Sequence, residues 1–241
     1  DQPVASDPSL PLYLDHAALS TPSVALANAA REVLHMADMV EQMLEGSREA
    51  FSGDDIDKVT AVSRTDDVID SLYDSIQLYI GSIDHDQLSD KEGQRIFSTL
   101  ALAINLEHIG DIVDKNLMEM AAQRIRDRRR LPQAAIERIN AMHMRLREHL
   151  RLAIDVFISG DARAARRLVS EKEAFRMLER DATERHFKEI RSGHLDQIEI
   201  SALQLDIVRD LKRIEAHIAA TVYSLLERNG DLQESRLSPV A

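Results

Sequence analysis

Apolar residues recur at three- and four-residue spacing through most of the chain, the pattern that predicts amphipathic helices. Thr21 and Pro22 predict the start of the first helix, because Thr is a common N-cap and Pro suits the first helical position. Residues 52–53 (SG) predict its end. Two further stretches predict a second helix over about 54–81 and a third from about 89 to 130. The apolar positions of the first helix are Val33, Met36, Val40, Met43 and Leu44.

The same pattern then occurs a second time. Residues 157–161 (FISGD) echo residues 51–54 (FSGD), and the segment over residues 204–218 resembles the segment over residues 101–115. The repeat spacing is about 106 residues, which is too long for a solenoid unit and suits a duplicated three-helix bundle. We therefore predict an all-α fold of six long antiparallel helices, divided into an N-terminal tether (1–21), a first bundle (22–130), a second bundle (131–229) and a C-terminal tail (230–241).

Composition narrows the classes of fold and function. Only 4% of the 241 residues are aromatic, and with 8 Gly and 6 Pro the chain favours helices over sheets. The net charge of −12 argues against a nucleic-acid partner. The absence of Cys excludes disulfides, zinc–thiolate sites and thiol catalysis. No apolar run approaches the roughly 20 residues that span a bilayer, and a start at Asp1 rather than Met predicts a piece excised from a longer protein.

One face of the third predicted helix is apolar in its first half and acidic in its second half. Alternate steps of four and three from Ile96 define an inward-facing row. Beyond its apolar start the row becomes acidic, and Asp111 lies one helical turn from Glu107 at the edge of the same face. The row consists of Ile96, Leu100, Ala103, Glu107, Gly110, Asp114 and Leu117.

The second predicted helix also places acidic residues beside an apolar stripe. Asp66 and Asp70 border this stripe, whereas Asp67 and Asp74 lie further round the helix and are expected to face water. The apolar stripe consists of Val62, Ile69, Leu72 and Ile76.

Two neighbouring helices are thus expected to bring several carboxylates together. Burying unpaired carboxylates is costly, so protonation, basic partners or bound cations must compensate. Oxygen ligands suit hard cations such as Mg²⁺, Ca²⁺, Mn²⁺ or ferric iron. We therefore predict a divalent or ferric metal ion, with ion pairing to protein or a solvated edge as the alternatives. The candidate ligands are Asp66, Asp70, Glu107, Asp111 and Asp114.

The second half offers an internal comparison. The repeat alignment places Lys172 and Arg176 at the positions of Asp66 and Asp70, and it places Lys212 and Ala216 at the positions of Glu107 and Asp111. These mixed charges can neutralise one another. A metal site is therefore expected in the first half only.

Residues 105–111 (NLEHIGD) resemble the E/D-xxx-D signature of PhoU domains, in which carboxylates of paired helices face a metal-binding patch. Three separated stretches resemble, more narrowly, the C-terminal region of bacterial sodium/phosphate cotransporters, where a PhoU-like domain follows the membrane segments. These stretches are residues 11–34, 106–117 and 210–227.

This resemblance implies a regulatory domain at the cytoplasmic face of the inner membrane, joined through residues 1–21 to a membrane-embedded sodium/phosphate transporter domain of the same polypeptide. It also implies a role in phosphate flux without catalysis. Two alternatives remain open: a free-standing PhoU-type adaptor that contacts a phosphate transporter and its sensor kinase, and a metal-dependent enzyme that uses Glu107 and Asp111. Self-association is also left open. The signature is lost at Lys212 and Ala216, which puts a second metal cluster in doubt.

Two further motifs, an arginine run and a Glu-x-x-His element, each allow a structural and a functional interpretation. A run of arginines near the end of the third helix complements the helix dipole, or else contacts the transporter or anionic lipid of the membrane surface. Glu32 and His35 match the Glu-x-x-His element of di-iron bundles, but such enzymes need that element twice, so no catalytic residue is expected. The arginines are Arg124, Arg126, Arg128, Arg129 and Arg130.

Overall fold

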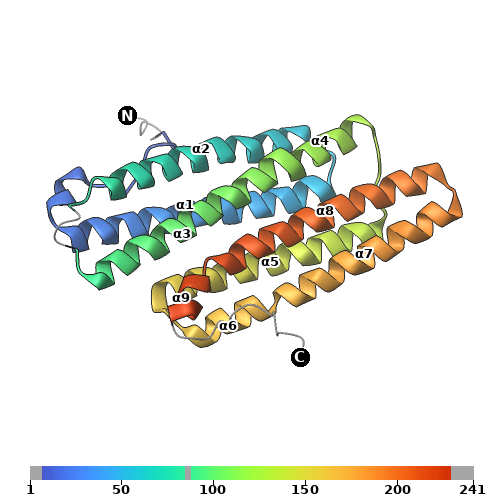
Figure 1. The fold of residues 1–241 in the computed structure, drawn as a ribbon. Coiled ribbons are helices and arrows are strands. Elements are labelled where there is room, and N and C mark those ends of the chain that lie inside the picture. The colour runs from blue at the N-terminus through green and yellow to red at the C-terminus, as the bar shows by residue number, and fades with distance from the viewer. Residues whose placement is uncertain (1–6, 85–87, 229–241) are drawn as a thin grey trace, which may run out of the picture.

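The computed structural model describes residues 7–84 and 88–228, and every regular element in these ranges is helical. Figure 1 shows two halves lying side by side with their long axes nearly aligned. The all-α prediction of six long helices is confirmed. The first half contains α1 (Pro22–Ser52), α2 (Ile56–Gly81) and a continuous helix made of α3 (Asp90–Ile112), the π-helical turn η3 (Val113–Met118) and α4 (Glu119–Arg126). The second half contains α5 (Gln133–Ser159), α6 (Ala162–Ser170), α7 (Lys172–Ser192), α8 (Leu195–Ala220) and α9 (Tyr223–Arg228).

Local sequence explains where most helices begin and end. The Asp55 carboxylate accepts hydrogen bonds from two backbone N–H groups at the start of α2. Ser89 and Glu92 form a reciprocal capping box at the start of α3. Gly160 and Gly193 end α5 and α7 with positive φ angles of 70° and 73°, a conformation that glycine adopts without a Cβ penalty.

Residues 7–21 differ from the extended tether expected for residues 1–21. They include the 3₁₀ helix η1 (His16–Ser20) and pack against α1 and α2. The Tyr13 backbone N–H donates to the buried Glu32 carboxylate at 2.6 Å, and the Tyr79 hydroxyl donates to the Asp15 carbonyl at 2.7 Å. These long-range hydrogen bonds have no counterpart in local periodicity, so the sequence pattern missed them. Residues 1–6 of the tether and the expected tail at 230–241 lie outside the described residues.

The last long helix is shorter than its apolar pattern predicted. The second bundle was predicted to extend to residue 229, with its last helix continuous to that point, but α8 ends at Ala220, and a turn at Thr221 and Val222 precedes α9. The Thr221 hydroxyl donates to the Ile218 carbonyl at 2.7 Å, a side-chain bond that competes with helix continuation. The turn allows Val222 and Leu226 to be buried while α9 packs against α6.

One hydrophobic core runs through both halves, which meet where α1 packs on α5 and α3 packs on α8. The halves are unequal in their outer helices. α2 packs against both α1 and α3, whereas α7 packs mainly against α8. Accordingly, α2 buries eight side chains and α7 buries only Phe175 and Ala182. The second half therefore leaves much of α7 exposed.

The continuous helix over residues 90–126 is long and apolar enough to cross a membrane by length and composition alone. The expectation that no segment approaches this length was therefore wrong. In this fold 44% of the most apolar 18-residue window is buried. Leu102, Leu106 and Ile109 of that helix belong to the core between α1, α2 and α8.

Candidate functional site

Three of the five predicted ligands meet where α2 faces α3. Carboxylate oxygens of Asp66, Asp70 and Asp111 all lie within 4.8 Å of one another. The Asp66 side chain is almost fully enclosed, with 4% exposure, and its Oδ1 atom has no hydrogen-bond partner. Asp70 is exposed and Asp111 is half-buried. The cluster therefore combines one buried carboxylate, that of Asp66, with two carboxylates that solvent can reach.

Gly110 makes this close approach of the two helices feasible. A Cβ atom at Gly110 would lie 2.5 Å from the Asp66 Oδ1 atom. Glycine within a helix lowers stability relative to alanine. Its presence at position 110 is explained by packing, because a larger side chain would collide with Asp66. The π-helical turn η3 begins at Val113, directly after the acidic segment, and such turns occur frequently at functional sites. Neither feature was identified as part of the site from sequence.

The electrostatics of the cluster favour a proton or a cation. Burial, followed by repulsion from Asp70, Asp114 and Asp111, raises the pKa of Asp66 to about 7. Burial and the charge of Asp111 also raise the pKa of Asp70. Lys115 forms an ion pair with Asp111 and is the nearby basic group that counteracts this repulsion. The positive charge of this one lysine thus offsets only part of the negative charge of the cluster.

The other two predicted ligands lie outside the tightest group. Glu107 and Asp114 are half-buried, and the Glu107 carboxylate lies 3.5 Å from the His108 ring nitrogen. Burial raises the pKa of Glu107, and Asp111 and Asp70 add to this effect. Both residues therefore border the cluster without entering it. Asp67 and Asp74 are exposed, as expected.

The counterpart positions in the second half hold separate pairs. Lys212 is paired with Glu179, Arg176 is 3.0 Å from Glu173, and the Lys172 ammonium donates to the Tyr223 hydroxyl at 2.6 Å. Among the residues that the structure describes, Asp66, Asp70 and Asp111 are the only group of three potential ligands in reach of one ion.

The arginine run at the end of α4 is not a uniform surface patch. Arg124 is 5% exposed, and its guanidinium donates to Asp54 and to the backbone carbonyls of Ala50, Gly53 and Arg129. It joins the end of α1 to the end of α4. The prediction that Arg124 contacts a membrane surface together with its neighbours is therefore wrong, because a guanidinium engaged by four internal acceptors cannot face lipid. Arg126, Arg128 and Arg130 are exposed.

A buried carboxylate and a half-buried one in the second half lie outside the site predicted from sequence. Glu215 of α8 is 99% enclosed and lies 2.7 Å from the His149 Nδ1 atom. Glu171 lies 3.8 Å from the other ring nitrogen and pairs with Arg145. This chain of charges ties α5 and α8 to the junction of α6 and α7. The offset that pairs Lys212 with Glu107 also pairs Glu215 with Gly110, so a carboxylate replaces the glycine that permits close packing, and this was the signal available in the sequence.

Glu32 of the Glu-x-x-His motif is also buried, but it serves the N-terminal segment. One carboxylate oxygen accepts the Tyr13 N–H, and the other has no partner. His35 packs edge-on against the Tyr13 ring. Among the described residues no second motif faces this one, so the contacts are those of a structural anchor.

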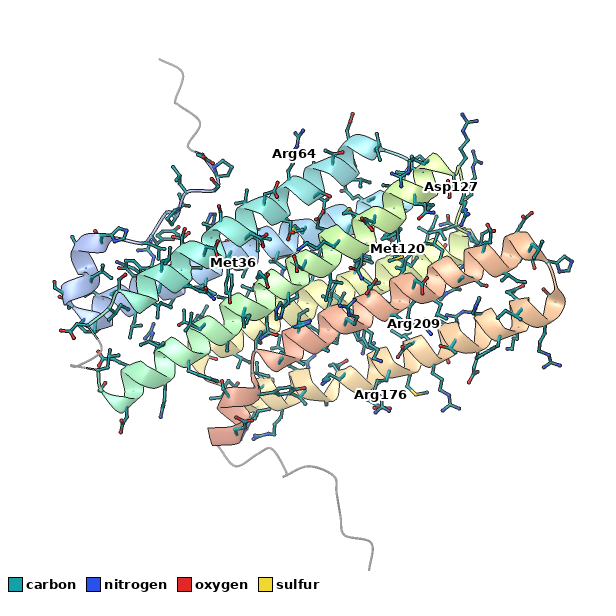
Figure 2. The ribbon with its side chains drawn as sticks, turned by 45° about the horizontal axis from the view of Figure 1, so that its top comes forward. Met36, Arg64, Met120, Asp127, Arg176 and Arg209 are labelled. Carbon is teal, nitrogen blue, oxygen red and sulfur yellow. The ribbon has the colours of Figure 1, made fainter. Side chains whose placement is uncertain are left out.

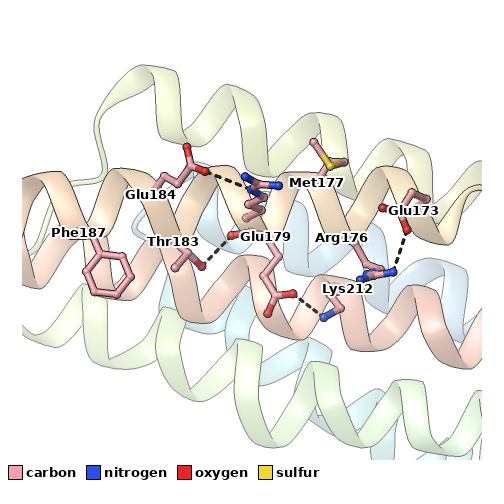
Figure 3. A pocket seen from close by; sticks show the side chains of 9 residues that line it. Glu173, Arg176, Met177, Glu179, Thr183, Glu184, Phe187 and Lys212 are labelled. Atoms are coloured by element: carbon pink, nitrogen blue, oxygen red, sulfur yellow. Dashed lines mark hydrogen bonds and ion pairs between the residues drawn. The ribbon is translucent and has the colours of Figure 1, made fainter. Parts of the chain in front are cut away.

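Two shallow grooves lie outside the cluster. One runs between the halves and is lined in part by Lys115, Met120 and Arg209; Figure 2 shows Met120 and Arg209 on facing helices. The other lies on α7, where Glu179 pairs with Lys212 and Phe187 borders the end of the groove (Figure 3). The α7 groove has no carboxylate cluster, and its charges are paired internally. Lys115, in contrast, connects the acidic cluster to the groove between the halves.

The chain is similar to known proteins. Residues 33–120, which include the whole cluster, match the family model of the PhoU domain. The chain is 35% identical over 228 residues to YjbB of Salmonella typhimurium (strain LT2) and 34% identical over 228 residues to YjbB of Escherichia coli (strain K12), both provisionally named inorganic phosphate export proteins. The match covers 95% of this chain but 42% of these relatives, so the chain spans about two fifths of their length.

The fold also resembles a solved structure. The crystal structure of PhoU from Pseudomonas aeruginosa superposes with a TM-score of 0.76, covering 86% of this chain and 99% of that chain. The sequence identity is 19%, so this likeness concerns the fold alone. None of the names of these relatives mentions sodium, and the narrower resemblance to sodium/phosphate cotransporters stays a prediction.

Proposed function

From the match of residues 33–120 to the PhoU family model, we propose that the chain is a non-catalytic regulatory module of phosphate transport that binds a hard cation at the acidic cluster. The observation that carries the proposal is the buried, unpartnered Oδ1 atom of Asp66 beside two accessible carboxylates. The relatives named as phosphate export proteins supply the connection to phosphate.

The residues at the cluster fit a cation. Carboxylate oxygens are the ligands that Mg²⁺, Ca²⁺, Mn²⁺ and ferric iron prefer. Asp66, Asp70 and Asp111 would hold the ion, and Glu107 and Asp114 border them. A bound cation supplies the positive charge that offsets the repulsion among these groups.

Cation binding would also change the groove between the halves. Lys115 is paired with Asp111 and lines that groove together with Arg209 and Asp210. An ion on Asp111 competes with the Lys115 ammonium for the same carboxylate. The released ammonium then becomes available at a surface formed by both halves, where a protein partner could sense it.

Two arrangements of this module with its transporter differ in connectivity. The first is a separate PhoU-type adaptor, whose fold this chain shares over 99% of the solved PhoU chain. The alternative is a domain of the sodium/phosphate cotransporter itself. In both arrangements we propose that the partner is a phosphate transporter and that the module acts at the cytoplasmic face of the inner membrane.

Phosphate flux tests the proposed role. Cells whose chromosomal copy carries Asp66→Asn are expected to lose the adjustment of radiolabelled phosphate flux to external phosphate, because the buried ligand is lost while the fold is retained. Asp67→Asn, an exposed neighbour, should behave as the parent. Unaltered flux control after deletion of the whole coding segment would refute the role. A native immunoblot band at 27.2 kDa supports the adaptor, and a larger band supports the cotransporter domain.

Elemental analysis tests the metal. Inductively coupled plasma mass spectrometry of the purified chain should find a stoichiometric divalent or ferric metal, and Glu107→Ala/Asp111→Ala should lose it because an accessible ligand and a bordering carboxylate are removed. Asp67→Ala/Asp74→Ala removes the same number of charges from exposed positions and should retain the metal. A metal-free parent whose melting temperature is unchanged by chelator would show that the cluster is protonated or ion-paired.

A further inference from the structure

One end of the molecule combines exposed apolar side chains with basic residues. The turn between α7 and α8 presents Phe187, Ile190 and Leu195 with exposures of 61%, 45% and 76%. The same end contains the linker from α4 to α5, because Arg129 of the linker lies 3.2 Å from Glu199 near the start of α8. Figure 1 shows the end of α4 and the α7–α8 turn at the same end of the two halves. We call this region the α7–α8 end.

The two segments of the α7–α8 end, residues 126–130 and 185–199, carry seven Arg and Lys against four Asp and Glu, a net charge of +3. The exposed basic side chains of this end form no ion pair among the residues that the structure describes. Arg185 adds further positive charge and lowers the pKa of Arg138, after the larger effect of burial. The acidic residues are Glu189 and Asp196 of the turn, with Asp127 and Glu199, which both pair with Arg129, whereas the whole chain has a net charge of −12. The unpaired basic side chains are Arg126, Arg128, Arg130, Lys188 and Arg191.

We propose that the α7–α8 end docks on an anionic lipid surface, with Phe187, Ile190 and Leu195 entering the interface. Basic side chains near anionic headgroups and apolar side chains below them are the two components of peripheral membrane binding. The apolar residues protrude at a turn, which suits a fluid interface and needs no complementary cleft. Nucleic acid would use the charges but would leave these apolar side chains in water.

This docking corrects and extends the membrane contact expected from the arginine run. Arg124 is excluded by its internal hydrogen bonds, and the contact gains the α7–α8 turn, which sequence spacing did not connect with the linker. Because α7 packs mainly against α8 alone, apolar residues on its other faces remain exposed. The proposal is independent of the cation site and of the phosphate role.

Vesicle flotation tests the docking on the 241-residue chain. The probes are vesicles of phosphatidylglycerol with phosphatidylethanolamine, and vesicles of phosphatidylcholine alone. One variant removes the apolar contacts (Phe187→Ser/Ile190→Ser/Leu195→Ser), and another reverses two charges (Lys188→Glu/Arg191→Glu). Leu78→Ser/Phe97→Ser removes exposed apolar side chains near the loop between α2 and α3 and serves as the matched control. Unchanged melting temperatures establish that the variants are folded.

The parent and the control are expected to float with the anionic vesicles and not with phosphatidylcholine. The charge variant should bind at least about thirtyfold more weakly, because each basic residue near an anionic surface contributes about fivefold in affinity. The apolar variant should lose at least about tenfold, and salt at about 1 M should abolish binding. Absent flotation of the parent, equal losses in the control, or salt-sensitive binding to an oligonucleotide but not to vesicles would each overturn the proposal.

Discussion

Replacing Arg124 with Met is expected to lower the free energy of unfolding by about 3 kcal/mol. The Arg124 guanidinium donates to Asp54 at 2.9 Å and to the Ala50 carbonyl at 3.2 Å, and it also bonds the carbonyls of Gly53 and Arg129. Methionine fills a similar volume but leaves these carbonyls without the guanidinium donor, and an unsatisfied buried carbonyl such as that of Ala50 costs about 1–3 kcal/mol. Most of the loss comes from the carbonyls, because Asp54 is largely exposed.

Thermal unfolding measures this effect directly. For a chain of this size, 1 kcal/mol corresponds to about 2–4 °C, so the melting temperature should fall by roughly 10 °C. Arg126→Met removes an exposed guanidinium two residues away and should stay within about 0.5 kcal/mol of the parent. Equal melting temperatures for the two variants would show that the Arg124 hydrogen bonds do not hold the ends of α1 and α4 together.

Replacing Asp66 with Asn is expected to stabilise the metal-free protein increasingly as the pH rises. Burial and the neighbouring carboxylates raise the pKa of Asp66 from 3.8 to about 7 in the folded state. The contribution of this group to stability is therefore fully present below pH 3.8 and is lost as the pH rises through 7. Between about pH 5 and about pH 8 the advantage of the Asn variant should grow by about 3 kcal/mol, at 1.36 kcal/mol per pH unit up to the folded pKa.

Chemical denaturation with chelator at both pH values measures this trend. The exposed Asp67→Asn variant should show no comparable trend. An advantage of Asp66→Asn that stays constant with pH would mean that Asp66 remains ionised throughout this range, against the effect of its burial.

A divalent cation should reverse the order of the two proteins at about pH 8. The ion binds the folded parent through Asp66, and at one hundred times its dissociation constant it would add about 2.7 kcal/mol to the free energy of unfolding. The Asn variant has lost the buried anionic ligand and should gain little. Equal stabilisation of both proteins would remove Asp66 from the cation site and leave the exposed carboxylates as the binding groups.

The candidate site was predictable in part because helical spacing places residues on faces. That argument placed Asp66 beside the apolar stripe of α2 and placed Asp111 at the edge of the acidic face of α3, and the structure brings these two together with Asp70. Helical spacing was less accurate for Asp114, which was predicted as a ligand but lies outside the group of three carboxylates. Asp114 follows the start of the π-helical turn at Val113. A π turn holds more residues than an α turn, so positions calculated for an ideal helix rotate away from their expected face beyond that point.

Local interactions were sufficient to predict the helical class and most helix boundaries. Apolar periodicity, Asp and Ser caps, and terminal glycines act within a few residues of one another, so they can be recognised in the sequence. Packing between distant segments decided the rest. It buried Asp66 against Gly110, enclosed Arg124 between α1 and α4, docked Tyr13 on Glu32, and left Phe187 exposed on α7. These outcomes depend on which surfaces meet, because burial and hydrogen bonding across the fold have no signature in local spacing.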